Sequence, residues 1–390
     1  MIGYVGAALN VSAAGGGDVR SGCKRAKAMI RLIQGARQTF RHRHDDITVR
    51  GVVDRMAFPV RASFELNGGP RRDLYVEQAK DEGIDWVNGY KASPAELRCR
   101  DQGEFCIEIA TDDETLMEGR NQVVVSCEDA LGKKAEASFV FDWNPEPLSL
   151  PLDISDLSRF SDIQEVGQIV NGAFDLDRDL NVIRSRSPVA PDALLVVGSP
   201  QGSQEATYAI RFLETAGAKW LGCSDFFAGL TDGVPARGIK VGWNSAGMAA
   251  LSPNDGARSF IAWGDHSGDA REWAIATHPA RPYAVERNVL YRVRHQIVLL
   301  EGCNRVRWRM WQDGEVEPEV WLCEENTGRL PAGLPTHRAA SFALFQHLGQ
   351  SIEWSDIVVR AFAPEPGDRL CSDTAKSREP FLKRVRPGSF

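Results

Sequence analysis

The apolar side chains of this 390-residue chain recur mostly at every second position, and this period constrains the fold more than any other feature. It is clearest in residues 60–66, where Val60, Ala62, Phe64 and Leu66 alternate with Arg61, Ser63 and Glu65. Because successive side chains of a strand point to opposite faces, the alternation predicts a strand with one buried face. The next four residues, Asn-Gly-Gly-Pro, are typical of a tight turn. Such segments recur without a long helical pattern between them, so we expect an all-β chain with antiparallel sheets.

A proline-rich segment divides the predicted strands into two blocks. Three prolines lie within residues 144–151, and a residue without an amide hydrogen cannot join the middle of a sheet, so we expect 147–151 to be a stiff linker. Before the linker, a small β-sandwich is predicted over 46–146, and after it a larger jelly-roll sandwich over 152–363. The clearest strands of the first block are 105–110, 122–127 and 137–142. Those of the second are 167–176, 193–198, 207–213, 239–243, 259–263, 289–300, 305–311, 320–323, 341–347 and 352–362.

The two ends of the chain differ from these blocks. Residues 1–44 carry eight lysines and arginines against one acidic residue, whereas the whole chain has a net charge of −7. We expect residues 1–45 to form a basic, solvated arm, in which Cys23–Phe40 permits one amphipathic helix. The apolar stretch near the start has no basic residues before it, so no secretion signal is expected and the localisation stays open. Residues 364–390 are proline-rich and are expected to be a tail.

Composition argues against several classes of function. The acidic net charge disfavours a nucleic-acid binder, and no run of about 18 apolar residues predicts a membrane span. None of the eight cysteines belongs to a C-x-x-C pair, so neither a zinc ribbon nor a thioredoxin-type motif is expected. Cys106 and Cys127 either face each other across the small sandwich as a disulfide or remain buried thiols.

The end of the first block resembles a known family. Residues 121–133 read N-Q-V-V-V-S-C-E-D-A-L-G-K and are followed by a strand that ends at Phe141. This segment is similar to the closing hairpin of bacterial immunoglobulin-like modules, although Cys127 and Lys133 depart from the usual residues. The resemblance implies an immunoglobulin-like sandwich that serves as a spacer or adhesive module.

The second block resembles another family. Residues 291–295 read Y-R-V-R-H, residues 311–314 read W-Q-D-G, residues 317–321 read E-P-E-V-W, and a last strand covers 352–359. These segments look like the late strands of concanavalin A-like (laminin G-like) sandwiches. The resemblance implies a jelly-roll sandwich and favours an extracellular role. It leaves the activity open, because that fold includes lectins, glycoside hydrolases, polysaccharide lyases and adhesion domains.

Two predicted strands place arginines side by side. If the apolar residues of 291–298 and 305–311 face the core, one polar face collects the predicted substrate-binding residues Arg292, Arg294, Gln296, Arg307, Arg309 and Trp311. Guanidinium groups fit carboxylates and sulfates, and an indole stacks on a sugar ring. We therefore expect recognition of an anionic polysaccharide on the concave sheet of the jelly roll. The alternative is an ordinary solvated face on which these arginines pair with acids such as Glu301, Asp313, Glu315 and Glu317.

Catalysis is a second hypothesis, as a polysaccharide lyase or a glycoside hydrolase. Hydrolysis needs two carboxylates across a cleft, and the E-x-D-x-E pattern of sandwich-fold hydrolases does not occur here. Weak catalytic candidates are His347, His295 and Tyr291, but the strand period places His295 on the core side. A third hypothesis is a non-catalytic protein-binding or adhesion module.

No metal site or cofactor is predicted. Residues 174–179 mimic the start of a calcium loop, but Leu180 and Arg186 stand where an EF-hand has Gly and Glu, which leaves only a structural calcium of another kind as a minor alternative. Among the tryptophans, Trp308 and Trp354 are expected in the core, and Trp243, Trp263 and Trp311 are candidates for stacking on sugars.

Overall fold

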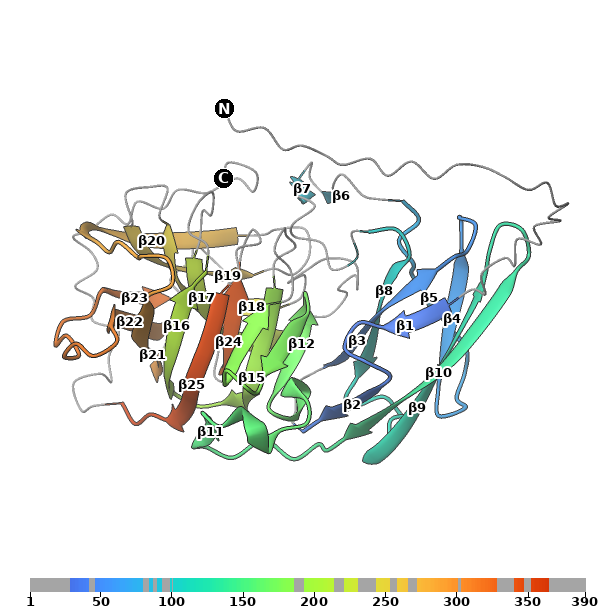
Figure 1. The fold of residues 1–390 in the computed structure, drawn as a ribbon, viewed down its shortest axis with the longest axis horizontal. Helices are drawn as coiled ribbons and strands as arrows, with labels where there is room; N and C mark the ends of the chain where they lie inside the picture. Colours follow the sequence, from blue (N-terminus) through green and yellow to red (C-terminus); the bar gives the residue numbers. More distant parts are fainter. Residues whose placement is uncertain are drawn as a thin grey trace, which may run out of the picture.

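Strands dominate the computed structural model, in agreement with the all-β prediction. It describes residues 29–41, 46–79, 84–86, 90–92, 99, 101–185, 193–213, 221–230, 243–252, 258–265, 272–300, 303–327, 340–346 and 352–364. Besides strands, these residues contain two short 3₁₀ turns, η3 (Leu157–Arg159) and η4 (Ile163–Glu165). Figure 1 shows two β-sandwiches side by side along the long axis of the molecule. Among the described residues there is no apolar helix of the length that a membrane crossing needs.

The small sandwich packs a sheet of three strands on a sheet of five. The first sheet has the order β1 (Met29–Leu32), β3 (Asp46–Asp54), β8 (Glu104–Ala110). The second has the order β2 (Arg37–Phe40), β10 (Lys134–Trp143), β9 (Gly119–Glu128), β4 (Arg61–Leu66), β5 (Arg72–Leu74). All neighbours are antiparallel except β2 and β10, which are parallel. A separate short hairpin pairs β6 (Ile84–Trp86) with β7 (Tyr90–Ala92).

The prediction of a basic arm with a helix is wrong for residues 29–41, which form β1 and β2 of this sandwich. Ile30 and Leu32 are buried at every second position, and so are Gln38 and Phe40. Gly35, with a φ of +96°, belongs to the turn between the two strands. The small sandwich therefore begins before residue 46. The rest of the expected arm and the tail beyond residue 364 lie outside the described residues.

The cysteines inside the small sandwich are thiols. Cys106 and Cys127 are both buried and do not form the disulfide that their positions permitted. Burial raises the pKa of Cys127 to about 11, which keeps this thiol protonated and unreactive at neutral pH.

The large sandwich is built from two antiparallel sheets, as expected for a jelly roll. The β13–β23 sheet has the order β13 (Phe174–Asp177), β14 (Val182–Ser185), β25 (Ile352–Ala361), β16 (Gln204–Phe212), β21 (Leu290–Leu300), β22 (Cys303–Gln312), β23 (Cys323–Thr327), and β11 (Leu152–Ile154) pairs with β25. The β12–β20 sheet has the order β12 (Gly167–Asn171), β15 (Ala193–Gln201), β24 (Ala340–Gln346), β17 (Leu221–Leu230), β18 (Trp243–Ser252), β19 (Arg258–Asp265), β20 (Glu272–Pro282). Trp308 and Trp354 lie in the core between them, as predicted, at 2% and 0% exposure.

The two sandwiches are joined by buried polar contacts as well as by the linker. The Gln164 Nε2 amide donates to Gln38 Oε1 at 2.6 Å, and the Gln168 Nε2 amide donates to Thr48 Oγ1 at 3.0 Å. Arg50 Nη1 donates to the carbonyl of Gly172 at 2.7 Å. We refer to Gln38, Thr48, Arg50, Gln164 and Gln168 as the junction network. All five are buried, so this network is closed to solvent.

Candidate functional site

The register of β21 and β22 gathers the predicted binding residues on one face. Arg292 lies opposite Trp311, Arg294 opposite Arg309, and Gln296 opposite Arg307. The alternate residues of β21 and β22 are buried between the two sheets, so these six side chains share the outer surface of the β13–β23 sheet. We refer to the six residues, Arg292, Arg294, Gln296, Arg307, Arg309 and Trp311, as the arginine face.

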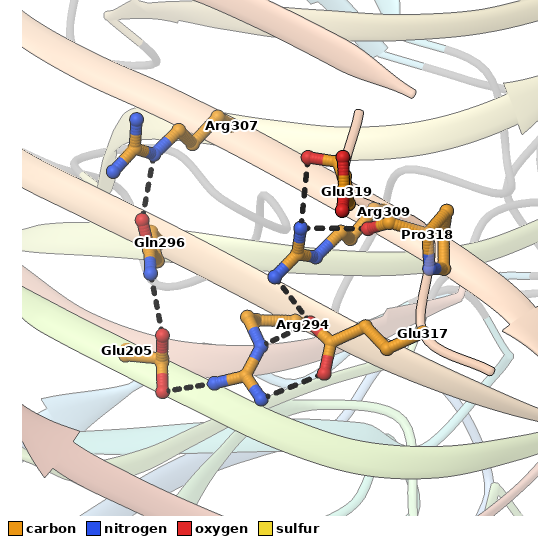
Figure 2. A network of polar contacts seen from close by, with 8 residues as sticks. All are labelled: Glu205, Arg294, Gln296, Arg307, Arg309, Glu317, Pro318 and Glu319. Carbon is orange, nitrogen blue, oxygen red and sulfur yellow. Dashed lines mark hydrogen bonds and ion pairs between the residues drawn. The ribbon is translucent and has the colours of Figure 1, made fainter. Parts of the chain in front are cut away.

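Three of the four arginines of this face are held by acidic partners. Arg292 donates to Asp313 and to Asp356, each at 2.6 Å. Arg294 lies between two carboxylates and donates to Glu205 at 2.5 Å and to Glu317 at 2.6 Å. Arg309 pairs with Glu317 and donates to the carbonyls of Pro318 at 2.7 Å and Glu319 at 3.1 Å (Figure 2). The alternative of acid-paired arginines therefore describes these three residues.

The loop between β22 and β23 supplies several of these partners. It follows Gln312 and passes through Gly314, whose φ of +87° suits a residue without a side chain. Asp313 and Glu317 come from this loop, and so does Trp321. The guanidinium groups of Arg307 and Arg309 lie 4.6 and 4.4 Å from the centre of the Trp321 ring, within the range of cation–π attraction. The E-P-E-V-W segment contains Trp321, but it indicated only the fold and not this contact.

The ion pairs shift the pKa values of Glu317, Arg294 and Arg292 toward their charged forms. Hydrogen bonding by Arg294 lowers the pKa of Glu317 and outweighs the opposing effect of its partial burial. Hydrogen bonding to Glu317 in turn raises the pKa of Arg294, and hydrogen bonding to Asp313 raises that of Arg292. Glu317 is therefore an ionised structural partner rather than a proton donor at neutral pH.

Arg307 differs from the other arginines of the face. Its Nε donates to Gln296 Oε1 at 2.6 Å, and its guanidinium group lies over Trp321 and 6.0 Å from the centre of the Phe362 ring. Among the described residues no carboxylate lies within ion-pairing distance of it, and its two terminal nitrogens have no hydrogen-bond acceptor. In Figure 2 these two nitrogens point away from the network.

The weak catalytic candidates are not on this face. His295 is completely buried, packs edge-on against Phe342 at 6.2 Å between ring centres, and has a pKa that burial lowers to about 3. Tyr291 is 4% exposed, and its hydroxyl accepts a hydrogen bond from the amide of Glu286 at 2.8 Å. Both occupy core-facing positions of β21, which explains why neither reaches the arginine face. His347 lies outside the described residues.

The described residues contain no group of three or more His, Cys, Asp or Glu side chains arranged to hold a metal ion. In the segment that mimics a calcium loop, Asp177 pairs with Arg184 at 2.9 Å. This carboxylate thus has a protein partner in the place of a cation.

A second polar region is a recess of about 860 Å³ beside the junction, at the opposite edge of the β13–β23 sheet. Its charged groups are mostly paired within the protein. Arg37 lies 3.5 Å from Asp142, and Arg41 lies 3.9 Å from Glu165. Arg178 donates to the carbonyl of Phe160 at 2.8 Å. The recess therefore resembles the arginine face in that most of its charged groups contact other groups of the protein.

Comparison with known proteins identifies no family. No family model and no curated protein matches the chain. Solved structures similar to it include a carbohydrate-binding module (CBM66) from Bacillus subtilis, with 9% identity, 50% of this chain and 95% of that chain covered, and a TM-score of 0.32. The carbohydrate recognition domain of Emp46p has 13% identity, covers 53% and 95%, and has a TM-score of 0.36. A bifunctional GH43-CE protein from Bacteroides eggerthii has 12% identity, covers 83% and 50%, and has a TM-score of 0.33. These scores are too low to support a conclusion about function.

Proposed function

We propose that the large sandwich recognises a polysaccharide, of anionic type, at the arginine face. The observation that carries the proposal is the gathering of guanidinium groups and indoles on adjacent strands of one sheet. Arginines bind carboxylate and sulfate groups through a planar fork of donors, and tryptophans offer a flat apolar surface to sugar rings. Trp311 is half-buried on the face, and Trp321 adds a second indole that packs against Arg307 and Arg309.

We propose that the small sandwich is an immunoglobulin-like spacer that precedes the binding module, with the boundary at residues 147–151. Its three-on-five arrangement of strands and the resemblance of residues 121–133 support this assignment. The linker itself packs on the large sandwich, since the Leu148 amide donates to Ser199 Oγ at 3.1 Å and Gln201 donates to the Leu148 carbonyl at 2.6 Å. The buried junction network further suits a spacer that holds the binding module in a fixed orientation.

Binding without cleavage is the better-supported activity. Arg294 brings Glu205 and Glu317 close together, and Arg292 in the same way brings Asp313 and Asp356 together. A glycosidase needs one of its two carboxyl groups protonated at working pH, which requires a raised pKa. The pKa of Glu317 is lowered instead. A lyase needs an accessible base, and Tyr291 and His295 are in the core.

Native electrophoresis tests the proposal directly. The protein is run through gels cast with polygalacturonate, dextran sulfate or neutral dextran, and the gels are then stained for intact polymer. We expect retardation in one or both anionic gels, with the polymer intact. A cleared track would identify an enzyme instead. Equal mobility in all gels would contradict glycan recognition and favour a protein partner, for which Val316 and Val320, 91% and 57% exposed on the β22–β23 loop, offer apolar contacts.

A further inference from the structure

We infer that Arg307 binds the negative charge of the ligand, a carboxylate or sulfate group on a sugar, and that the other arginines of the face hold it in position. This inference rests on the proposed function and makes it specific. The proposed function requires only that a glycan binds at the face, whereas the inference assigns the charge contact to one residue among four arginines.

Arg292, Arg294 and Arg309 are poor candidates for this role because their charges are already compensated. Arg292 and Arg294 each contact two carboxylates of the protein, and Arg309 contacts one. An anionic ligand at any of them would have to displace a carboxylate that is covalently tethered nearby. At Arg307 no such displacement is needed, because none of the described carboxylates pairs with it.

A relay of hydrogen bonds fixes the orientation of Arg307. Arg294 donates to Glu317 at 2.6 Å and to Glu205 at 2.5 Å. The side-chain amide of Gln296 donates to Glu205, and its side-chain oxygen accepts a hydrogen bond from Arg307 Nε at 2.6 Å (Figure 2). Gln296 is 4% exposed and so lies in a confined setting. The relay uses the Nε of Arg307 and leaves its two terminal nitrogens as a parallel pair of donors. This pair matches two oxygens of one carboxylate or sulfate.

The aromatic rings complete the subsite. Trp321 and Phe362 pack against the guanidinium group and limit its movement and its contact with water. A half-buried, pre-oriented guanidinium group loses less side-chain entropy on binding than a free surface arginine and interacts in a lower dielectric. The site therefore suits a ligand that carries a single anionic group next to an apolar ring surface, such as a uronic acid or a sulfated sugar.

The salt dependence of binding distinguishes one charge contact from several. Affinity for polygalacturonate and for dextran sulfate is measured by titration calorimetry at several salt concentrations for the wild type, Arg307→Gln, Arg307→Lys and the control Arg61→Gln. Arg61 is on the small sandwich, with its side chain 87% exposed, so its substitution removes the same charge elsewhere. The polymer that binds tells a carboxylate ligand from a sulfate ligand.

For the wild type we expect the logarithm of the affinity to fall with the logarithm of the salt concentration with a slope of about 1, because each neutralised charge contributes roughly that amount. Arg307→Gln should bind about 10- to 100-fold more weakly, with a slope near zero. Arg307→Lys should keep the slope and lose about tenfold, since an ammonium group lacks the paired donors. Arg61→Gln should match the wild type.

Two results would overturn the inference while leaving glycan recognition intact. One is unchanged affinity and slope in Arg307→Gln. The other is a wild-type slope near 4, which would mean that all four arginines of the face contact the polymer. Absence of binding by the wild type to any polymer would instead overturn the proposed function. Thermal melting accompanies each titration, and Arg307→Lys, which keeps the charge and the aliphatic stem, supplies the comparison if Arg307→Gln melts early.

Discussion

The junction network and the arginine face are both networks of polar side chains, but they differ in exposure and in whether their outermost groups have partners in the protein. At the junction every residue of the network is between 0% and 7% exposed, and the three hydrogen bonds that define the network lie inside the protein. On the arginine face four of the six side chains are charged and most are partly exposed, and the chain of contacts ends at Arg307, whose terminal nitrogens point away from the network. A closed network stabilises an arrangement of strands, whereas a network with one open end can also present a group to a ligand.

The energetic consequences of the two networks should differ in the same way. Removing one partner of a buried hydrogen bond leaves the other unsatisfied, at a cost of about 1–3 kcal/mol. Exposed ion pairs contribute roughly 0–1 kcal/mol each, because water and salt screen them. The junction network should therefore influence stability and the arginine face should influence affinity.

Arg50→Ala is expected to have the largest effect on stability. The substitution leaves the buried carbonyl of Gly172 without its donor and removes a buried aliphatic stem, so the free energy of unfolding should fall by about 3 kcal/mol. Urea denaturation followed by tryptophan fluorescence measures the change, with Arg61→Ala as the exposed control. Polymer affinity should be unchanged. A loss of stability no larger than that of the control would remove the distinction between the two networks.

His295 offers a second test, because it is on the core side of the strand that carries Arg294 and Gln296. Burial lowers its pKa to about 3, below its ordinary value of 6.5, so the folded protein binds this proton less readily than the unfolded chain. The contribution of neutral, buried His295 to the free energy of unfolding is therefore complete above pH 6.5. It is lost as the pH falls toward 3, at up to about 1.4 kcal/mol per pH unit.

His295→Phe should therefore flatten the decline of stability between pH 6.5 and pH 4, as measured by urea denaturation at each pH. Polymer affinity at pH 7 should be the same as in the wild type, because the ring does not reach the arginine face. An unchanged pH profile would show that His295 is not the group that titrates. Altered affinity would show that the two faces of β21 are coupled.

Gln296→Leu should give a smaller effect than any change at Arg307 itself. The charge of Arg307 remains, but its Nε loses the acceptor that orients it, so affinity for the anionic polymer should fall about threefold to fivefold with an unchanged salt slope. The control is Gln102→Leu, at an exposed position of the small sandwich. A loss as large as that of Arg307→Gln would mean that Gln296 contacts the ligand directly. No loss would remove the positioning role.

The sequence predicted one side of the site well, for a physical reason. The alternation of apolar residues in β21 and β22 requires one face to be buried, so the residues of the opposite face could be named in advance. Their partners could not be named. Glu205 and Asp356 are contributed by β16 and β25, far along the chain, and only the order of strands in the sheet brings them to β21.

The missed elements share a related cause. β2 is four residues long and pairs in parallel with β10, about one hundred residues away, so nothing local distinguishes it from a basic arm. The junction residues are polar, and a polar side chain is predicted to be exposed unless its buried partner is known. Gln38 and Gln168 find such partners only because a second sandwich packs against the first.

The most direct test of the account removes the negative charge from the ligand rather than the positive charge from the protein. The anionic polymer that binds is compared with its uncharged counterpart, polygalacturonate with its methyl ester or dextran sulfate with dextran, for both the wild type and Arg307→Gln. The account predicts that the wild type binds the charged form at least tenfold more tightly and that Arg307→Gln binds both forms equally. Equal affinity of the wild type for the two forms would contradict it.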